Sequence, residues 1–252
     1  MPIDTLSLAG KIAIVTGSGR ENGIGAGIAR ALARNGAAVT INYVSDSVTK
    51  RAQALADSIT ADGGRATVVR ASVETPEGAK SIVQETLKAF GTDKIDILVN
   101  NAGTGFLGGT VDATPEEISK TFDLNVKGTI FVTQATIPHM PPGGRIINIS
   151  STDSRLGPDD LAIYGASKAA VDSLTWSKGI TVNAVTPGPV VTDIAPPEIA
   201  ELIRKPQREI TRAAYRNGTI EDIGDAVLLL VSEKARWITG QYISVSGGVT
   251  GL

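Results

Sequence analysis

Short apolar runs alternate with longer segments of helical periodicity along almost the whole chain. The apolar runs predict buried β-strands at residues 11–16, 38–43, 66–70, 95–99, 145–150, 180–185 and 242–245. The segments between them repeat apolar residues at helical spacing and predict α-helices at residues 25–36, 47–61, 75–90, 114–135, 162–178 and 220–232. Residues 196–215 are polar and only loosely helical in pattern.

This order of elements is typical of parallel β-α-β units joined by right-handed crossovers. We therefore expect an α/β fold with one doubly wound parallel sheet of about seven strands and helices on both faces. Ligands of such sheets bind beyond the carboxyl ends of the strands. Residues 187–206 contain five prolines, which predicts a mobile flap over the site within about residues 187–216; an ordinary surface loop is the alternative.

A glycine-rich turn from Thr16 to Gly27 joins the first predicted strand to the first predicted helix. Glycine lets the backbone turn tightly and approach a ligand, and the free N–H groups at the start of the helix suit a phosphate. Gly17, Gly23 and Gly25 fit neither the G-x-G-x-x-G pattern nor a P-loop. A plain turn is the alternative for an isolated glycine cluster, but the flanking strand and helix favour a phosphate site.

Composition narrows the functions further. The net charge is −2 with both signs interspersed, which argues against nucleic acid or an anionic membrane as a partner. The chain has no cysteine and a single histidine, so we expect neither disulfides nor a metal site. No apolar run is long enough to span a membrane, and the N-terminal residues lack the pattern of a signal peptide. We therefore expect a cytoplasmic protein.

Tyr164 and Lys168 lie four residues apart on a predicted helix and share one face. A lysine cation nearby lowers the pKa of a tyrosine, which would make Tyr164 a usable acid or base; an amphipathic surface pair is the alternative. Ser151 follows the strand at 145–150, so its hydroxyl can converge with the phenol. Asn125 lies within a predicted helix, where Asn is unfavourable. Each of these two has an ordinary alternative, a turn cap for the serine and a tolerated polar contact for the asparagine.

Together these motifs resemble the short-chain dehydrogenase/reductase family, and the resemblance covers residues 8–248. The order of motifs also matches: the glycine loop, Asn100-Asn-Ala-Gly103, Asn125, Ser151, Tyr-x-x-x-Lys and the run from Pro187 to Thr192. The resemblance implies a Rossmann-type, NAD(P)-binding single domain over residues 1–252 that forms a homodimer or homotetramer. It is nearest to ketoacyl-reductase-like and polyketide-ketone-reductase-like members.

The resemblance also implies a role for each matching residue. Tyr164 would exchange a proton with the carbonyl or alcohol oxygen, and Lys168 would lower its pKa and hold the nicotinamide ribose. Ser151 would orient the carbonyl, and Asn125 would keep a water for a proton relay. The cofactor itself carries the hydride. The residues expected to bind it are Gly17, Arg20, Gly23, Ile24, Gly25, Tyr43, Ser45, Ser72, Val73, Asn100, Asn101, Ala102, Gly103, Tyr164, Lys168, Pro187, Gly188, Val190 and Thr192.

The end of the second predicted strand indicates which nicotinamide is preferred. Family members that prefer NAD carry Asp at the position of Tyr43, where the carboxylate holds the ribose 2′-hydroxyl. Ser45 and Arg20 offer a hydroxyl and a guanidinium, which suit a 2′-phosphate. We therefore expect NADP(H), with NAD(H) as the alternative because a shifted loop could present Asp46 to the ribose.

Two departures from the family pattern concern the cofactor site. Five residues separate Gly17 from Gly23 where the family pattern has three, so Arg20-Glu-Asn22 looks like a two-residue expansion of the loop. Ser72-Val73 stands where Asp-Val or Asp-Leu usually contacts the adenine, which predicts a weaker contact or none.

A third departure lies after the predicted catalytic pair. Gly179 follows Tyr164 by fifteen residues, about two helical turns fewer than the family pattern. A helix of that length can still return the chain to the next parallel strand. The missing far end predicts either an altered dimer interface or an incomplete sequence.

These expectations lead to an NADPH-dependent oxidoreductase that reduces a ketone to a secondary alcohol. The substrate would be a moderately apolar ketone, β-ketoacyl thioester or polyketide-type carbonyl. Residues 104–110 and the flap would form its pocket, with Phe106, Leu107, Leu156 and Ile194 as candidate lining residues. Two alternatives stay open: an NADP-binding protein without redox turnover, in which the shortened helix misplaces the catalytic pair, and an NAD-dependent alcohol dehydrogenase.

Overall fold

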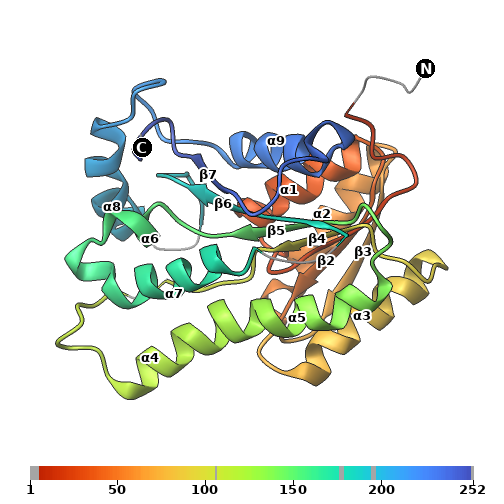
Figure 1. Cartoon of the computed structure of the whole chain (residues 1–252), viewed down its shortest axis with the longest axis horizontal. Coiled ribbons are helices and arrows are strands. Elements are labelled where there is room, and N and C mark those ends of the chain that lie inside the picture. The colour runs from red at the N-terminus through yellow and green to blue at the C-terminus, as the bar shows by residue number, and fades with distance from the viewer. Residues whose placement is uncertain (1–5, 106, 176–178, 194–196, 251–252) are drawn as a thin grey trace.

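The computed structural model describes residues 6–105, 107–175, 179–193 and 197–250. Its strands form one parallel sheet of seven strands in the order β3-β2-β1-β4-β5-β6-β7 (Figure 1). They are β1 (Ile12–Val15), β2 (Ala38–Tyr43), β3 (Arg65–Arg70), β4 (Ile97–Asn100), β5 (Arg145–Ile149), β6 (Thr181–Pro187) and β7 (Tyr242–Val245). β1 pairs with β2 on one side and with β4 on the other, so the strand order reverses at β1. The predicted doubly wound α/β fold is confirmed.

Helices cover both faces of this sheet (Figure 1). One face carries α1 (Ile24–Arg34), α2 (Thr49–Ala61) and α9 (Ile220–Val231). The other carries α3 (Pro76–Phe90), α5 (Gly128–Thr136) and α7 (Ala162–Ser173). Three helices lie outside these layers: α4 (Pro115–Phe122), which leads into α5, α6 (Asp153–Leu156), which follows β5, and α8 (Pro197–Glu209), which follows β6.

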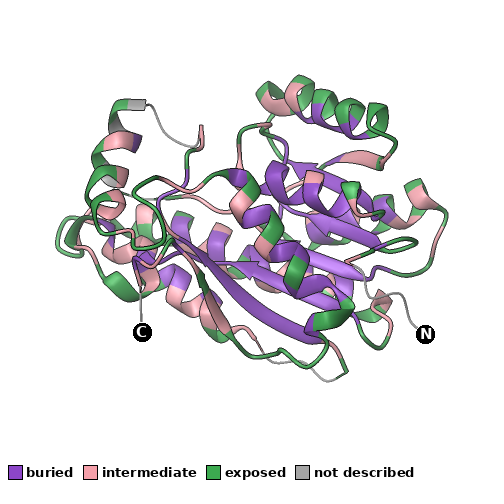
Figure 2. Ribbon diagram, turned by 90° about the horizontal axis from the view of Figure 1, so that it is seen from above, coloured by how far each residue is buried: buried purple, intermediate pink, exposed green. Residues whose placement is uncertain are grey.

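Alternate side chains of the strands pack against opposite helical layers. Val15 belongs to an apolar cluster with Leu32 of α1, whereas its neighbour Ile14 belongs to a second cluster with Ile82 of α3. Side chains of a strand alternate between the two faces of its sheet, and both faces are covered here, so most of the sheet is buried (Figure 2). The strands β1, β2, β4, β5 and β6 are buried at every residue, whereas the edge strands β3 and β7 are partly exposed. Burial on both faces is why the central strands are rich in apolar residues.

Two glycines allow close contact between α1 and α9. A Cβ built on Gly224 would lie 2.7 Å from the carbonyl oxygen of Gly27, and one built on Gly27 would overlap the carbonyl of Ile220. Any larger residue at either position would force the two helices apart, because close-packed interiors do not accommodate added atoms freely.

The structure corrects three element boundaries that the sequence predicted. The helix predicted at 114–135 is interrupted by a π-helical turn at Asp123–Lys127, which contains Asn125. The helix predicted to reach residue 178 ends at Ser173. The loosely helical segment at 196–215 is the regular helix α8 over most of its length. Among the described residues, no helix is both long and apolar enough to cross a membrane.

Candidate active site

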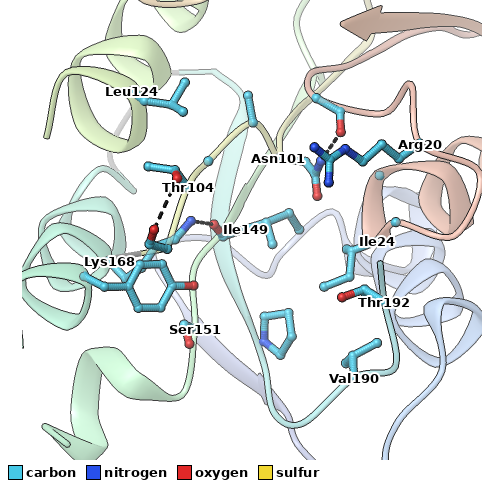
Figure 3. A pocket seen from close by; sticks show the side chains of 18 of the residues that line it. Arg20, Ile24, Asn101, Thr104, Leu124, Ile149, Ser151, Lys168, Val190 and Thr192 are labelled. Atoms are coloured by element: carbon cyan, nitrogen blue, oxygen red, sulfur yellow. Dashed lines mark hydrogen bonds between the residues drawn. The ribbon is translucent and has the colours of Figure 1, made fainter. Parts of the chain in front are cut away.

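A cavity of about 620 Å³ opens where the segments after β1, β2, β4, β5 and β6 come together. This is the carboxyl edge of the sheet, where doubly wound folds bind their ligands. Figure 3 shows Ser151 and Lys168 on one side of the cavity and Arg20, Ile24 and Thr192 on the other. The cavity therefore joins the predicted phosphate loop to the predicted catalytic residues.

Most of the predicted site residues line this cavity. They are Gly17, Arg20, Gly23, Ile24, Gly25, Tyr43, Ser45, Ser72, Val73, Asn101, Ala102, Gly103, Ser151, Tyr164, Lys168, Pro187, Gly188, Val190 and Thr192. Asn100 and Asn125 do not line it. The Asn100 side chain is buried and donates to Asn148 Oδ1 at 2.9 Å and to Thr133 Oγ1 at 3.0 Å. Its expected contact with the cofactor is therefore wrong for the side chain, which links β4 to β5 and α5.

The glycine loop has the features that a phosphate requires. Gly17 has φ of 61°, and a Cβ there would lie 2.7 Å from the Ala102 Cα atom. Asn101 Nδ2 holds the loop by donating to the carbonyl oxygens of Thr16 at 2.8 Å and Gly17 at 3.1 Å. α1 starts after Gly23 without any side-chain cap, so its first N–H groups stay free to bind an anion. The residues present fit the pyrophosphate of a dinucleotide.

The far end of the cavity, at β2, lacks a carboxylate from that strand. Tyr43 occupies its end, and Ser45 lies on the cavity wall. Asp46 is not among the lining residues and pairs with Arg70, whose Nη2 donates to Asp46 Oδ2 at 2.9 Å. Asp46, the carboxylate on which the NAD(H) alternative depended, is therefore paired with Arg70 and does not line the cavity.

The expanded part of the glycine loop bridges the two walls of the cavity. Arg51 of α2 forms ion pairs with Glu21 of the loop, at 2.5 Å, and with Asp193, which follows β6. Arg20 Nη1 also donates to the Asp193 carbonyl oxygen at 3.3 Å. We call the ion-paired side chains Glu21, Arg51 and Asp193 the clasp. The hydrogen bond from Arg51 lowers the pKa of Glu21, which keeps the clasp charged at neutral pH.

The three predicted catalytic side chains at the other end lie close together. Lys168 is buried, and its Nζ donates to the Ile149 carbonyl oxygen at 2.9 Å (Figure 3). The same Nζ lies 5.8 Å from the centroid of the Tyr164 ring. Ser151 lies close enough to the Tyr164 hydroxyl to lower its pKa. Tyr164 and Lys168 both reach the cavity because residues four apart lie on one face of a helix.

Burial dominates the ionisation of this pair. Desolvation raises the pKa of Tyr164 to about 12, and a hydrogen bond with Ser151 lowers it only in part. Desolvation also lowers the pKa of Lys168 to about 8. The lowering of the Tyr164 pKa by Lys168 stays a prediction; in the protein without its ligands, burial outweighs the hydrogen bond with Ser151 and the net effect is a raised pKa.

Asn125 supports the cavity from behind. Its Nδ2 donates to the Thr104 carbonyl oxygen at 3.0 Å and to Ser167 Oγ at 2.9 Å, and its Oδ1 accepts from Thr104 N at 2.8 Å. The side chain thus ties the loop after β4 to α7. The predicted water-holding role stays a prediction, with the amide side chain engaged by protein partners.

Sequence reasoning missed the polar residues at the substrate end. Asp153 of α6 and Arg204 and Gln207 of α8 line the cavity beside Ser151. Of the predicted substrate residues, Leu107 lines the cavity and Leu156 does not. Phe106 and Ile194 lie outside the described residues. The only signal for Asp153 was its place two residues after Ser151. α8 lies within the loosely helical segment predicted at 196–215, but nothing in its sequence singled out Arg204 or Gln207.

Known proteins are similar to this chain in sequence and in fold. The family profile described as enoyl-(acyl carrier protein) reductase matches residues 17–250. The short-chain dehydrogenase/reductase FrzI of Cladobotryum sp is 41% identical over 256 residues, which cover 96% of this chain and 97% of FrzI. The chain belongs to the short-chain dehydrogenase/reductase family.

Solved structures of similar proteins carry nicotinamide cofactors. Blue fluorescent protein from a metagenomic library, in complex with NADPH, is 34% identical with a TM-score of 0.87, and the match covers 97% of this chain and 100% of that one. The angucycline C-6 ketoreductase LanV, with bound NADP, is 36% identical with a TM-score of 0.86, and the match covers 96% of each chain. These dehydrogenase/reductase relatives agree with the dinucleotide fit of the cavity. In the described part of the chain, no group of His, Asp and Glu side chains is placed to hold a metal.

Proposed function

We propose that this short-chain dehydrogenase/reductase is an NADPH-dependent reductase that converts a ketone to a secondary alcohol. The observation that carries the proposal is the convergence of Ser151, Tyr164 and Lys168 at one end of a cavity whose other end is a glycine loop and an uncapped helix N-terminus. When bound, the nicotinamide supplies the hydride.

The ionisation of Tyr164 favours the reductive direction. With a pKa raised to about 12, the phenol carries its proton at neutral pH and can donate it to a carbonyl oxygen. Lys168, with a pKa of about 8, is still mostly cationic there and would stabilise the phenolate left behind. The Ser151 hydroxyl, next to the phenol, would hydrogen-bond the same carbonyl oxygen. Oxidation of an alcohol would use the same residue in the opposite direction, with the phenolate as base, so comparing the two directions under matched conditions tests the alcohol dehydrogenase alternative.

Three features support NADP(H) over NAD(H). The end of β2 offers Tyr43 rather than an acid, and Asp46 is paired with Arg70. Arg20 and Ser45 line the cavity and provide a cation and a hydroxyl, the groups that bind a 2′-phosphate. The similar protein LanV also has NADP bound. The single domain, the cytoplasmic location and the homodimer or homotetramer stay predictions of the sequence.

The test compares NADPH and NADH oxidation with a panel of ketones, in wild type, Tyr164→Phe and Tyr215→Phe. Tyr164→Phe should lower kcat by at least about a hundredfold, the usual contribution of general acid catalysis, with NADPH binding retained in fluorescence. Tyr215 is 72% exposed, so Tyr215→Phe should behave as wild type. Undiminished turnover in Tyr164→Phe would refute the assigned proton donor. NADPH binding without oxidation of any ketone would refute the reductase.

A further inference from the structure

A buried carboxylate lies beside the proposed catalytic serine. Asp153, the first residue of α6, is 7% exposed and lines the cavity. Its Oδ2 accepts a hydrogen bond from Ser151 Oγ at 3.1 Å, and its Oδ1 accepts one from Gln207 Nε2 at 3.2 Å. An ionised carboxylate has about four lone-pair sites for hydrogen bonds, so these two donors leave it able to accept more. Burial raises the pKa of Asp153, so an added donor would help to hold its charge.

This contact has a consequence for catalysis. The Ser151 hydroxyl has a single proton, and in the protein without ligands that proton is directed at Asp153. Ser151 cannot give the same proton to a carbonyl oxygen at the same time. A substrate hydroxyl that donates to Asp153 Oδ2 would replace the serine as donor and free the Ser151 proton for the carbonyl.

The neighbouring helix α8 adds donors to the same end of the cavity. Arg204 lines the cavity, and its Nε is buried without a hydrogen-bond partner among the described residues. Buried polar atoms are normally hydrogen-bonded, so this donor calls for an acceptor from a ligand. Leu107, Leu124 and Leu161 provide apolar wall in the same cavity. The substrate end therefore combines an apolar wall with a polar corner, whereas the candidate lining residues predicted from the sequence were all apolar.

We propose that Asp153 recognises a hydroxyl group of the substrate, and that the substrate is an α- or β-hydroxyketone. The proposal rests on the reductase function proposed above. Ser151 Oγ and Asp153 Oδ2 are 3.1 Å apart, so a carbonyl oxygen on the first and a hydroxyl on the second are held close together. Two oxygens on adjacent carbons, as in an α-hydroxyketone, or on carbons separated by one carbon, as in a β-hydroxyketone, meet this requirement, whereas a plain ketone leaves Asp153 holding the serine proton.

The experiment measures kcat/KM with NADPH for two matched pairs: α-hydroxyacetophenone with acetophenone, and 4-hydroxybutan-2-one with butan-2-one. Each ratio of hydroxyketone to plain ketone is compared between wild type and Asp153→Ala, which cancels the different intrinsic reactivity of the two carbonyls. Loss of a hydrogen bond to a charged group should reduce the ratio about tenfold or more. The plain ketone should be reduced faster by Asp153→Ala than by wild type, because Ser151 is then free.

Asp159→Asn is the matched control, since Asp159 is exposed on the following turn and does not line the cavity; its ratios should equal those of wild type. NADPH fluorescence verifies that Asp153→Ala is folded, and Asp153→Asn, which keeps the side-chain volume, should show a smaller loss of the same ratio. Ratios that stay at the wild-type value in both Asp153 variants would overturn the proposal. Wild type that binds NADPH and reduces no ketone would instead overturn the reductase function, and the substrate class with it.

Discussion

Replacing Lys168 by Met should make the protein more stable and inactive. Lys168 is 5% exposed, and among the described residues no carboxylate lies within ion-pair distance of its Nζ. Its one hydrogen bond joins Nζ to the Ile149 carbonyl oxygen. The attraction of Asp172 offsets only part of the desolvation of Lys168. A buried cation that is not fully compensated opposes folding, and an apolar side chain of similar length removes that cost. The substitution would thereby separate the contribution of the lysine to catalysis from its effect on the free energy of unfolding.

The size of the effect follows from the pKa of Lys168, which falls from the ordinary 10.5 to about 8. One pKa unit corresponds to about 1.4 kcal/mol, so the buried charge costs on the order of 3 kcal/mol. Loss of the hydrogen bond to Ile149 offsets about 1 kcal/mol. The net gain of about 2 kcal/mol should raise the unfolding temperature by roughly 4–8 °C for a chain of this size.

The pH dependence gives the sharper test. Because the folded-state pKa of Lys168 is the lower one, the cost of its charge is fully present below pH 8 and disappears as the pH rises toward 10.5. The gain in unfolding temperature of Lys168→Met over wild type should therefore be largest at neutral pH, fall as the pH rises above 8, and be lost before pH 10.5, where only the missing hydrogen bond to Ile149 remains. Calorimetry across this range measures it, with Lys88→Met as control, because Lys88 is 79% exposed.

Three outcomes bear on this reasoning. A stability gain at neutral pH that fades with rising pH, together with lost ketone reduction, would support it. A Lys168→Met variant that is less stable than wild type at neutral pH would refute it, because the ammonium would then be stabilising the fold. A gain of equal size at every pH would show that packing of the methionine, rather than removal of the charge, is responsible.

Two further predictions concern the clasp and the contact between α1 and α9. Glu21→Gln weakens the pair with Arg51, a part-exposed interaction worth about 1 kcal/mol. Because the clasp bridges the two walls of the cavity, NADPH should then dissociate about fivefold faster in stopped flow at low salt, with little difference at high salt. An unchanged rate would show that the clasp does not help to retain the cofactor. Gly224→Ala should lower the unfolding temperature by several degrees, because its Cβ would lie 2.7 Å from the Gly27 carbonyl oxygen; an unchanged temperature would show that α1 and α9 separate easily.

The elements that the sequence predicted well are those whose signal is local. Strands buried on both faces are rich in apolar residues, so the central strands appeared in the sequence as short, mostly apolar runs. The glycine loop was recognisable because its residues, flanked by a strand and a helix, lie next to one another in the chain. Tyr164 and Lys168 could be paired because four residues complete about one helical turn.

The polar corner of the cavity could not be predicted, because it depends on how distant segments pack. Asp153 lies on a short helix after β5, and Gln207 lies on α8, which follows β6. Their contact at 3.2 Å arises only once both helices have packed at the carboxyl edge of the sheet. No pattern along the chain predicts that this aspartate is buried or that it contacts this glutamine. Apolar candidates such as Leu107 could be proposed from the sequence, and they indicated a less polar substrate than the cavity does.

The π-helical turn around Asn125 shows a second limit of sequence patterns. The apolar periodicity of residues 114–135 predicted one continuous helix, yet Asn125 lies in a turn that is wider than an α-helical one. Both polar atoms of its amide are bonded to the Thr104 backbone, and Nδ2 also reaches Ser167. Turns of this kind occur at functional sites. The unfavourable helix position of Asn125 was the only local sign of it.

The short connection from α7 to β6 leaves the proposed catalytic pair in place, for a geometric reason. Tyr164 and Lys168 lie in the first two turns of α7, next to the carboxyl edge of the sheet, and the Lys168 carbonyl oxygen accepts from Ser150 Oγ at 3.1 Å. At the other end, Asn148 Nδ2 donates to the Leu174 carbonyl oxygen at 2.8 Å, so α7 is held against β5 at two points. β6 still pairs with β5 in parallel register. These contacts fix Tyr164 and Lys168 at the cavity, which removes the reason for expecting a misplaced catalytic pair.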